Sequence, residues 1–194
     1  MADSNKVKFG LKNVHYAVAT VSGSTVTYGT PKAIAGAVNL SLDAQGGETN
    51  FYADDSKYYV TSANQGYSGD LEVAKFPEDF LKDIFGFATD DNGILYEDAA
   101  IEPKQFALLF EFSGDANETR HALYLCNASR PAVASGTIQD TKEPVTESTT
   151  ITAVPLPVDS NGKQIVRGKA NKGDTKYSAW FNAVQTVTVA STTL

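Results

Sequence analysis

The sequence predicts a mainly β protein: a β-sandwich or open barrel with one short flanking α-helix at about residues 77–85 and a long exposed loop. Three observations predict this class. Apolar and polar residues alternate along one segment after another, which is typical of strands with one buried face. Turns rich in glycine, serine or aspartate separate these segments, and only one stretch has helical periodicity. Because the chain has 194 residues, 42% of them hydrophobic, we expect one domain spanning residues 1–194.

The first strands are predicted from clear alternation. We expect strands at residues 13–21, 25–28 and 35–44, the first two forming a hairpin around residues 22–24. The apolar positions that should face the core are Val14, Tyr16, Val18, Val38, Leu40 and Leu42.

Residues 49–86 organise the middle of the chain. Residues 50–59 set four aromatic side chains among acidic and small polar residues, and we expect a long loop there. Residues 67–74 then alternate as a half-buried strand, and residues 77–85 predict the helix.

The helix is predicted from its ends and its apolar stripe. Pro77 suits the first helical position, and Glu78 and Asp79 place negative charge in the first turn, where the helix dipole favours it. Gly86 suits a left-handed C-terminal cap. The stripe that should pack on the core consists of Phe80, Leu81, Ile84 and Phe85.

The C-terminal half supplies further strands. They are predicted at residues 94–96, 106–112, 120–127, 136–139 and 148–156. Residues 106–112 have the strongest pattern, and residues 120–127 should return beside them as a central hairpin. Residues 163–176 are rich in lysine and glycine and predict a mobile loop, whereas residues 178–189 should close the fold with Trp180 and Val184 facing inward.

Charge is unevenly distributed along the chain. The formal net charge of −7 argues against a basic nucleic-acid-binding surface. Residues 43–98 contain 13 acidic residues and 3 lysines, a net charge of −10, and the remainder has 10 acidic and 13 basic residues, a net charge of +3. The acidic middle could therefore meet the basic remainder of a neighbouring subunit. The alternative is a solvated acidic face that aids solubility.

No catalytic, metal or cofactor site is predicted. His15 and His121 occupy strand positions without a partner at diagnostic spacing, and there is no glycine-rich phosphate loop or nucleophile elbow. Residues 90–93 fail as a calcium loop because its first and twelfth positions would be Ala88 and Ala99. We therefore expect a protein that is not an enzyme and binds no cofactor.

The lone Cys126 alternates within a predicted strand, so we expect a small core residue rather than a nucleophile. The N-terminal residues contain no apolar signal core, and no apolar run approaches membrane-spanning length. The sequence thus predicts synthesis in a reducing cytoplasm and no membrane partner.

An ordered series of motifs runs through nearly the whole chain. These are residues 50–55 (Asn-Phe-Tyr-Ala-Asp-Asp), 66–72 (Gly-Tyr-Ser-Gly-Asp-Leu-Glu), 77–80 (Pro-Glu-Asp-Phe) with Gly86, 106–111 (Phe-Ala-Leu-Leu-Phe-Glu), 120–124 (Arg-His-Ala-Leu-Tyr), 128–131 (Ala-Ser-Arg-Pro), and 143–144 (Glu-Pro) before a threonine-rich strand. In this order they resemble the major tail proteins, or tail tube proteins, of long-tailed non-contractile bacteriophages that infect Gram-positive bacteria.

The resemblance implies a structural subunit of the virion tail, made in the host cytoplasm. Members of that family form hexameric rings that stack into a hollow tube, with a long loop of the β-sandwich contacting the adjacent ring. The implied partners are other copies of the chain, a tape-measure protein, and tail terminator and initiator proteins. DNA is expected to pass through the tube without specific binding.

Three groups of residues are candidates for these roles. Loop residues expected to bridge stacked rings are Phe51, Tyr52, Asp54, Asp55, Tyr58 and Tyr59. Acids that could line the lumen and repel DNA phosphates are Asp43, Glu48, Asp70, Glu72, Asp90 and Asp91. Basic residues that could meet the acidic middle of a neighbour are Lys163, Arg167, Lys169, Lys172 and Lys176.

Two alternatives stay open. One is another virion role on the same kind of scaffold, such as a capsid decoration or tail-tip protein. The other is a carbohydrate-binding module that uses the exposed tyrosines as a stacking platform. Some loop aromatics could also pack beneath the sandwich as a small core of their own.

Overall fold

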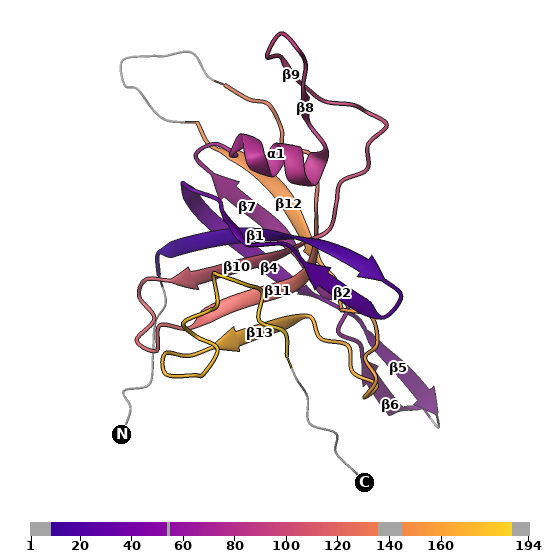
Figure 1. Cartoon of the computed structure of the whole chain (residues 1–194). Coiled ribbons are helices and arrows are strands. Elements are labelled where there is room, and N and C mark those ends of the chain that lie inside the picture. The colour runs from indigo at the N-terminus through magenta and orange to yellow at the C-terminus, as the bar shows by residue number, and fades with distance from the viewer. Residues whose placement is uncertain (1–8, 54, 136–144, 188–194) are drawn as a thin grey trace, which may run out of the picture.

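The computed structural model describes residues 9–53, 55–135 and 145–187, and in them the chain is mainly β with one short helix (Figure 1). The elements in chain order are β1 (Leu11–Ser22), β2 (Thr25–Tyr28), β3 (Lys32–Ala33), β4 (Ala37–Gln45), β5 (Glu48–Ala53), β6 (Ser56–Ser62), β7 (Gly66–Val73), α1 (Glu78–Phe85), β8 (Ala88–Thr89), β9 (Leu95–Tyr96), β10 (Phe106–Phe112), β11 (Arg120–Ala128), β12 (Glu147–Ala153) and β13 (Arg167–Ala170). The predicted fold class is confirmed.

Most strands belong to one antiparallel sheet. Its order is β2-β1-β10-β11-β12-β7-β4, with β3 added to β1 and β13 added to β11. Strands β1 and β4, although distant in this order, also contact each other, because the sheet curls around the main core. The hairpins β5–β6 and β8–β9 form two small sheets of their own.

The main core lies inside this curl and is closed by α1. It contains Tyr16 from β1, Leu71 from β7, Phe106 from β10 and Ile151 from β12. Phe80 of the helix lies at its centre, with ring centroids 5.0 Å from Tyr16 and 5.8 Å from Phe106, both edge to face. The predicted helical stripe therefore packs as expected, since aromatic pairs in this geometry add to the burial of apolar surface.

The ends of α1 follow the sequence closely. Gly86 caps the C-terminus at φ 73°, and a Cβ there would come within 2.4 Å of Ile101. Pro77 lies at the N-cap, one residue before the helix, rather than at the first helical position. Its extended backbone, with ψ at 142°, explains this small difference.

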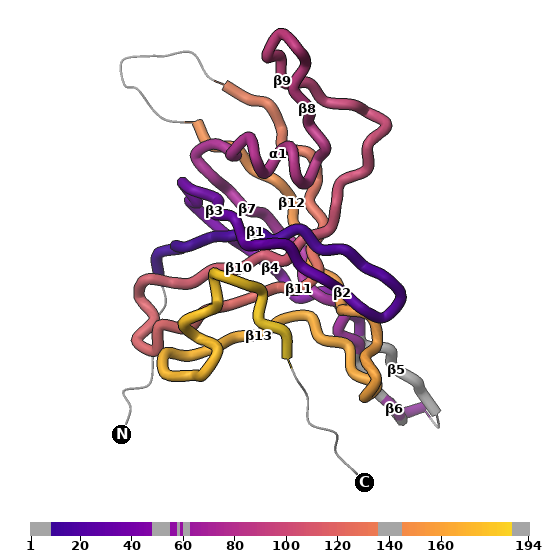
Figure 2. Tube along the Cα trace, in the orientation of Figure 1, coloured from indigo at the N-terminus to yellow at the C-terminus, as the bar shows by residue number. Residues whose placement is uncertain are grey.

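A second core covers the opposite face of β10 and β11. Leu109, Tyr124 and Trp180 are buried there, and the Trp180 indole donates a hydrogen bond to the His121 carbonyl at 3.2 Å. In Figure 2 the yellow C-terminal segment crosses these strands. Trp180 and the partly buried Val184 face inward as predicted, but residues 178–183 run through turns, and residues 178–187 contain no strand.

Two β-bulges shift the predicted alternation. The register between β4 and β7 slips at Val38, which leaves that side chain 53% exposed and lets Ala37 pack on the core instead. A second slip on β11 places Leu123 and Cys126 together in the main core. A bulge adds one residue to one strand and reverses the faces beyond it, which a strict period of two does not anticipate.

Two predicted loops are strands. Residues 50–59 lie mostly within the β5–β6 hairpin, and residues 167–170 of the predicted mobile loop form β13, which pairs with β11. The strand predicted at residues 136–139 lies outside the described residues.

One polar contact fixes α1 to the sheet. Asp83 accepts hydrogen bonds from the Tyr16 hydroxyl at 2.8 Å and from the Lys32 ammonium at 2.7 Å. Partial burial by itself raises the pKa of Asp83, but these hydrogen bonds outweigh burial and hold that pKa below its usual value.

We expect Asp83→Asn to lower the free energy of unfolding by about 1–2 kcal/mol at neutral pH, since charge-assisted hydrogen bonds are lost. Because the pKa of Asp83 is lower in the folded state, its contribution is complete above the unfolded pKa and disappears as pH falls through the folded pKa. Urea unfolding should therefore show the two proteins converging below about pH 4. Asp91→Asn, an exposed change in the turn between β8 and β9, is the control, and equal losses for both variants would contradict this role.

Candidate functional site

The predicted ring-bridging loop is the β-hairpin β5–β6. Phe51 pairs with Tyr59 in its register, and a bulge follows between Phe51 and Tyr52. The hairpin pairs with no other described strand, and in Figure 1 it projects from the body away from α1. Aromatic and β-branched residues favour strands, and this signal could have predicted the hairpin from the sequence.

The base and the tip of this hairpin have special backbone conformations. At the base, an added Cβ on Gly46 would lie only 1.8 Å from the Ala63 carbonyl oxygen, so glycine is needed where the two arms approach. At the tip, Asp55 has φ of 55°, in the left-handed region that aspartate tolerates. Tyr59 is 61% exposed and Asp55 is exposed as well, whereas Asp54 lies outside the described residues.

Three of the predicted lumen acids share one sheet face. In the register, Asp43 lies opposite Ser68, and Glu72 lies on β7 two residues beyond Asp70. The remaining partners on this face of β4, β7 and β12 are also polar and uncharged: Asn39, Ser41, Ser148, Thr150 and Thr152. The other face of the same strands forms the main core. We call this surface the polar face; none of these positions carries a basic residue.

Hydroxyl groups hold the acids of the polar face in place. Thr150 donates a hydrogen bond to Asp70 at 2.8 Å, and Thr146 donates one to Glu72. Ser68 and Thr152 lie 3.4 Å apart, hydroxyl to hydroxyl. Among the three acids of the polar face, Asp70 and Glu72 are thus held by hydroxyl groups of neighbouring threonines.

The other lumen candidates lie elsewhere. Asp90 and Asp91 belong to the β8–β9 turn that follows α1, where Asp90 accepts backbone hydrogen bonds from Ile94 at 2.7 Å and from Asn92 at 2.9 Å. These bonds, that of Ile94 first, lower the pKa of Asp90. Asp90 therefore stabilises its own turn, and neither residue joins the polar face. Glu48 begins β5.

The predicted basic segment divides into two groups. Arg167 and Lys169 lie on β13, and no carboxylate among the described residues is within ion-pair distance of either. Lys172 instead pairs with Glu118 within the chain at 2.6 Å, and this hydrogen bond raises the pKa of Lys172. Lys163 and Lys176 are exposed in turns.

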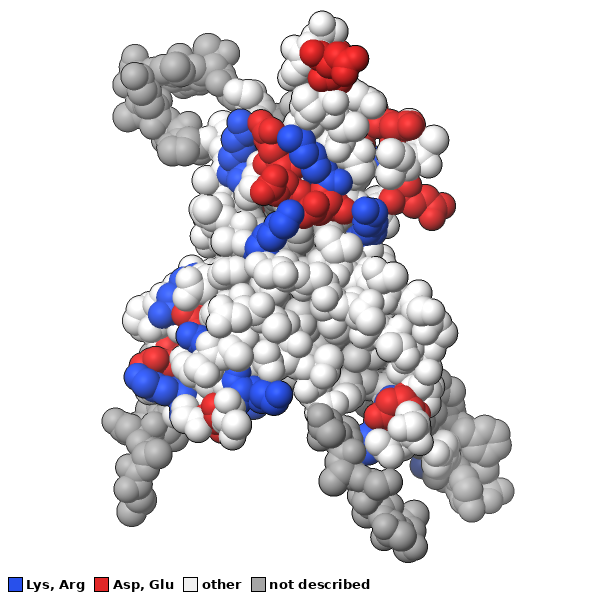
Figure 3. Space-filling model, viewed as in Figure 1, with Lys and Arg blue, Asp and Glu red and all other residues white. Residues whose placement is uncertain are grey.

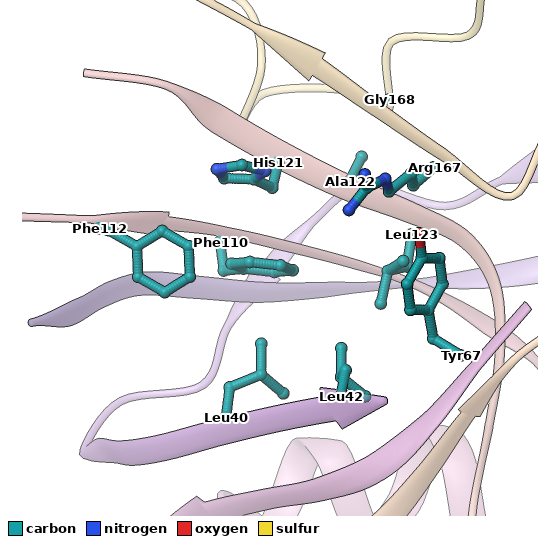
Figure 4. A pocket seen from close by; sticks show the side chains of 10 residues that line it. All are labelled: Leu40, Leu42, Tyr67, Phe110, Phe112, His121, Ala122, Leu123, Arg167 and Gly168. Atoms are coloured by element: carbon teal, nitrogen blue, oxygen red, sulfur yellow. The ribbon is translucent and has the colours of Figure 1, made fainter. Parts of the chain in front are cut away.

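A cavity that the sequence did not predict opens beside β13. Its volume is about 150 Å³. Residues of five strands line it, among them Leu42, Tyr67, Phe110, His121, Leu123 and Arg167. Figure 4 shows Tyr67 and Arg167 at one end and Phe112 at the other. We call this cavity the β13 socket. Because its lining comes from five strands that are remote in sequence, no local sequence pattern could have predicted it.

Both histidine rings stack on phenylalanine rings. The His121 ring stacks on Phe110 at 5.2 Å, and the His15 ring stacks on Phe181 at 4.7 Å. Within the described part of the chain, no group of three histidine, cysteine or acidic residues could hold a metal ion. The described helix is also too short to cross a membrane.

Burial raises the pKa of the Cys126 thiol to about 12, and its side chain is fully enclosed in the main core. We expect no reaction with a disulfide reagent such as DTNB at pH 8 in the native protein and one thiol per chain after unfolding, because thiolate is the reactive form. Ser24→Cys, at the exposed β1–β2 turn, should react at once and serves as the control. Rapid labelling of native wild type would show that the core opens.

Neither a scan against models of protein families nor a search of curated proteins finds a match to this chain. The resemblance to tail tube proteins therefore stays a hypothesis that rests on the order of the sequence motifs.

Proposed function

We propose that the protein is a structural subunit of a bacteriophage tail tube, which assembles into stacked rings and forms a conduit for DNA. The polar face carries this proposal. A strand face with three acids, many hydroxyl groups and no base repels phosphates and stays hydrated, so that DNA slides past it instead of binding. Counterion-releasing DNA binding needs the opposite charge.

Sheet edges provide a route to rings. Strands β2 and β4 end the path of the large sheet, so each presents one edge without a described partner strand. The paired part of the β1–β2 hairpin, Ala19 to Tyr28, lies in a stretch, residues 16–31, without a charged residue. Figure 3 shows uncharged surface between the charges over α1 and those at the opposite end. An uncharged edge such as that of β2 favours strand pairing between copies, and pairing of two different edges closes rings or builds filaments.

The projecting hairpin provides a route to stacking. An exposed tyrosine supplies a large contact area at low entropic cost, which is typical of interface residues. A hairpin that pairs only with itself can reach a neighbouring ring without disturbing the sandwich. Tape-measure, terminator and initiator proteins complete the assembly in this proposal.

Concentrated purified protein, incubated for hours to days, should form rings or hollow tubes in negative-stain electron microscopy. The expected symmetry is six-fold, as the resemblance implies. Monomeric particles at every concentration, together with tyrosine fluorescence quenched by sugars, would favour a carbohydrate-binding module instead. Tyr59 would be the reporter in that assay, since Trp180 is buried.

Replacing acids of the polar face by lysines should make the tube bind DNA. We expect tubes of the double variant Asp43→Lys and Asp70→Lys to retain short duplex DNA in co-sedimentation at low salt and to release it as salt rises. The matched control is Asp91→Lys with Glu102→Lys, which changes net charge equally at exposed positions outside this face. Equal DNA retention by both variants would contradict the lumen assignment.

A further inference from the structure

We propose that the β13 socket receives the Tyr59 side chain of a second copy of this chain. The inference rests on the proposed self-assembly and adds which surface accepts the hairpin. Tyr59 cannot fill the socket of its own copy in this structure, because 61% of its surface is exposed. One molecule therefore has both an exposed aromatic side chain, Tyr59, which we call the knob, and an open apolar cavity, the β13 socket.

The size and lining of the socket fit a phenol ring. A cavity of about 150 Å³ with apolar walls is large enough for a benzene ring. Leu42, Phe110 and Leu123 supply such walls, and the ring of His121, stacked on Phe110, adds an aromatic one. The Arg167 guanidinium lies 5.2 Å from the Tyr67 ring centre, so a cation already packs on a tyrosine at the end of the socket.

The charges around knob and socket are complementary. Residues 48–62 contain three acids and one lysine, and Asp55 is exposed at the hairpin tip. Beside the socket, Arg167 and Lys169 have no carboxylate within ion-pair distance among the described residues. An acidic hairpin tip and a basic rim attract each other and fix the direction of docking.

Knob and socket are different surfaces, which fixes the type of assembly. A contact between two unlike surfaces of identical molecules is head to tail, so it propagates into a ring or filament instead of ending at a pair. The partner in this proposal is therefore another copy of the chain, and each such contact adds one more copy to the stack.

A disulfide test uses two singly substituted copies. A Lys57→Cys copy carrying a mass tag is mixed with an untagged Lys169→Cys copy, assembled, and oxidised; these exposed positions leave Tyr59 and Arg167 in place, and native Cys126 is fully buried and does not compete. We expect a heterodimer on non-reducing gels, since the engineered thiols meet only between copies. In the control mixture, Asp91→Cys replaces Lys169→Cys and should give no disulfide-linked dimer.

The outcomes separate this inference from the proposed function. Tubes with equal heterodimer in both mixtures, or with none in either, would overturn the socket while leaving the tube proposal intact. Failure of wild-type protein to assemble under all conditions would count against the tube proposal itself and, with it, the socket.

As a second measurement, Tyr59→Ala should lose assembly and Tyr59→Phe should keep it; assembly of both at wild-type level would also overturn the socket.

Discussion

Strand β10 is covered on both faces, and the rest of the structure depends on this double burial. Six of its seven residues are buried. Phe106, Leu108 and Phe110 face the main core, whereas Leu109 faces the second core. Different parts of the chain cover the two cores. The curled sheet and α1 enclose the main core, and the C-terminal segment with Trp180 covers the second core. Burying this much apolar surface stabilises the fold, and the other strands of the sheet can keep a polar face toward solvent.

Charged side chains connect β10 to the C-terminal segment that covers the second core. They are needed because a carboxylate of β10 is buried together with the apolar residues of this strand. Glu111, on β10, is 5% exposed and would be costly to bury alone. Arg120 lies 3.1 Å from its carboxylate and Lys12 lies 3.3 Å away. The Arg120 guanidinium also packs on the Tyr177 ring at 3.9 Å and donates a hydrogen bond to the Tyr177 carbonyl. The same side chain that neutralises Glu111 thus fixes the C-terminal segment.

The division between buried and exposed faces also shapes the candidate assembly surfaces. In β7, Leu71 and Val73 belong to the main core, and Asp70 and Glu72 lie on the polar face because successive side chains alternate. A strand anchored by its apolar residues holds its acids at fixed positions. The polar face and the projecting hairpin coexist in one small protein because different strands supply them.

The sequence by itself determined the fold class, the helix with its Gly86 cap, and most strands, because these depend on periodicity and local backbone preference. It also placed Asp43, Asp70 and Glu72 at alternating strand positions, and in the structure all three lie on the polar face. Only the tertiary structure decided that Lys172 is already paired with Glu118, and that residues remote in sequence form the β13 socket. The bulges at Val38 and on β11 were likewise beyond local pattern, since strand register depends on partners brought together by folding.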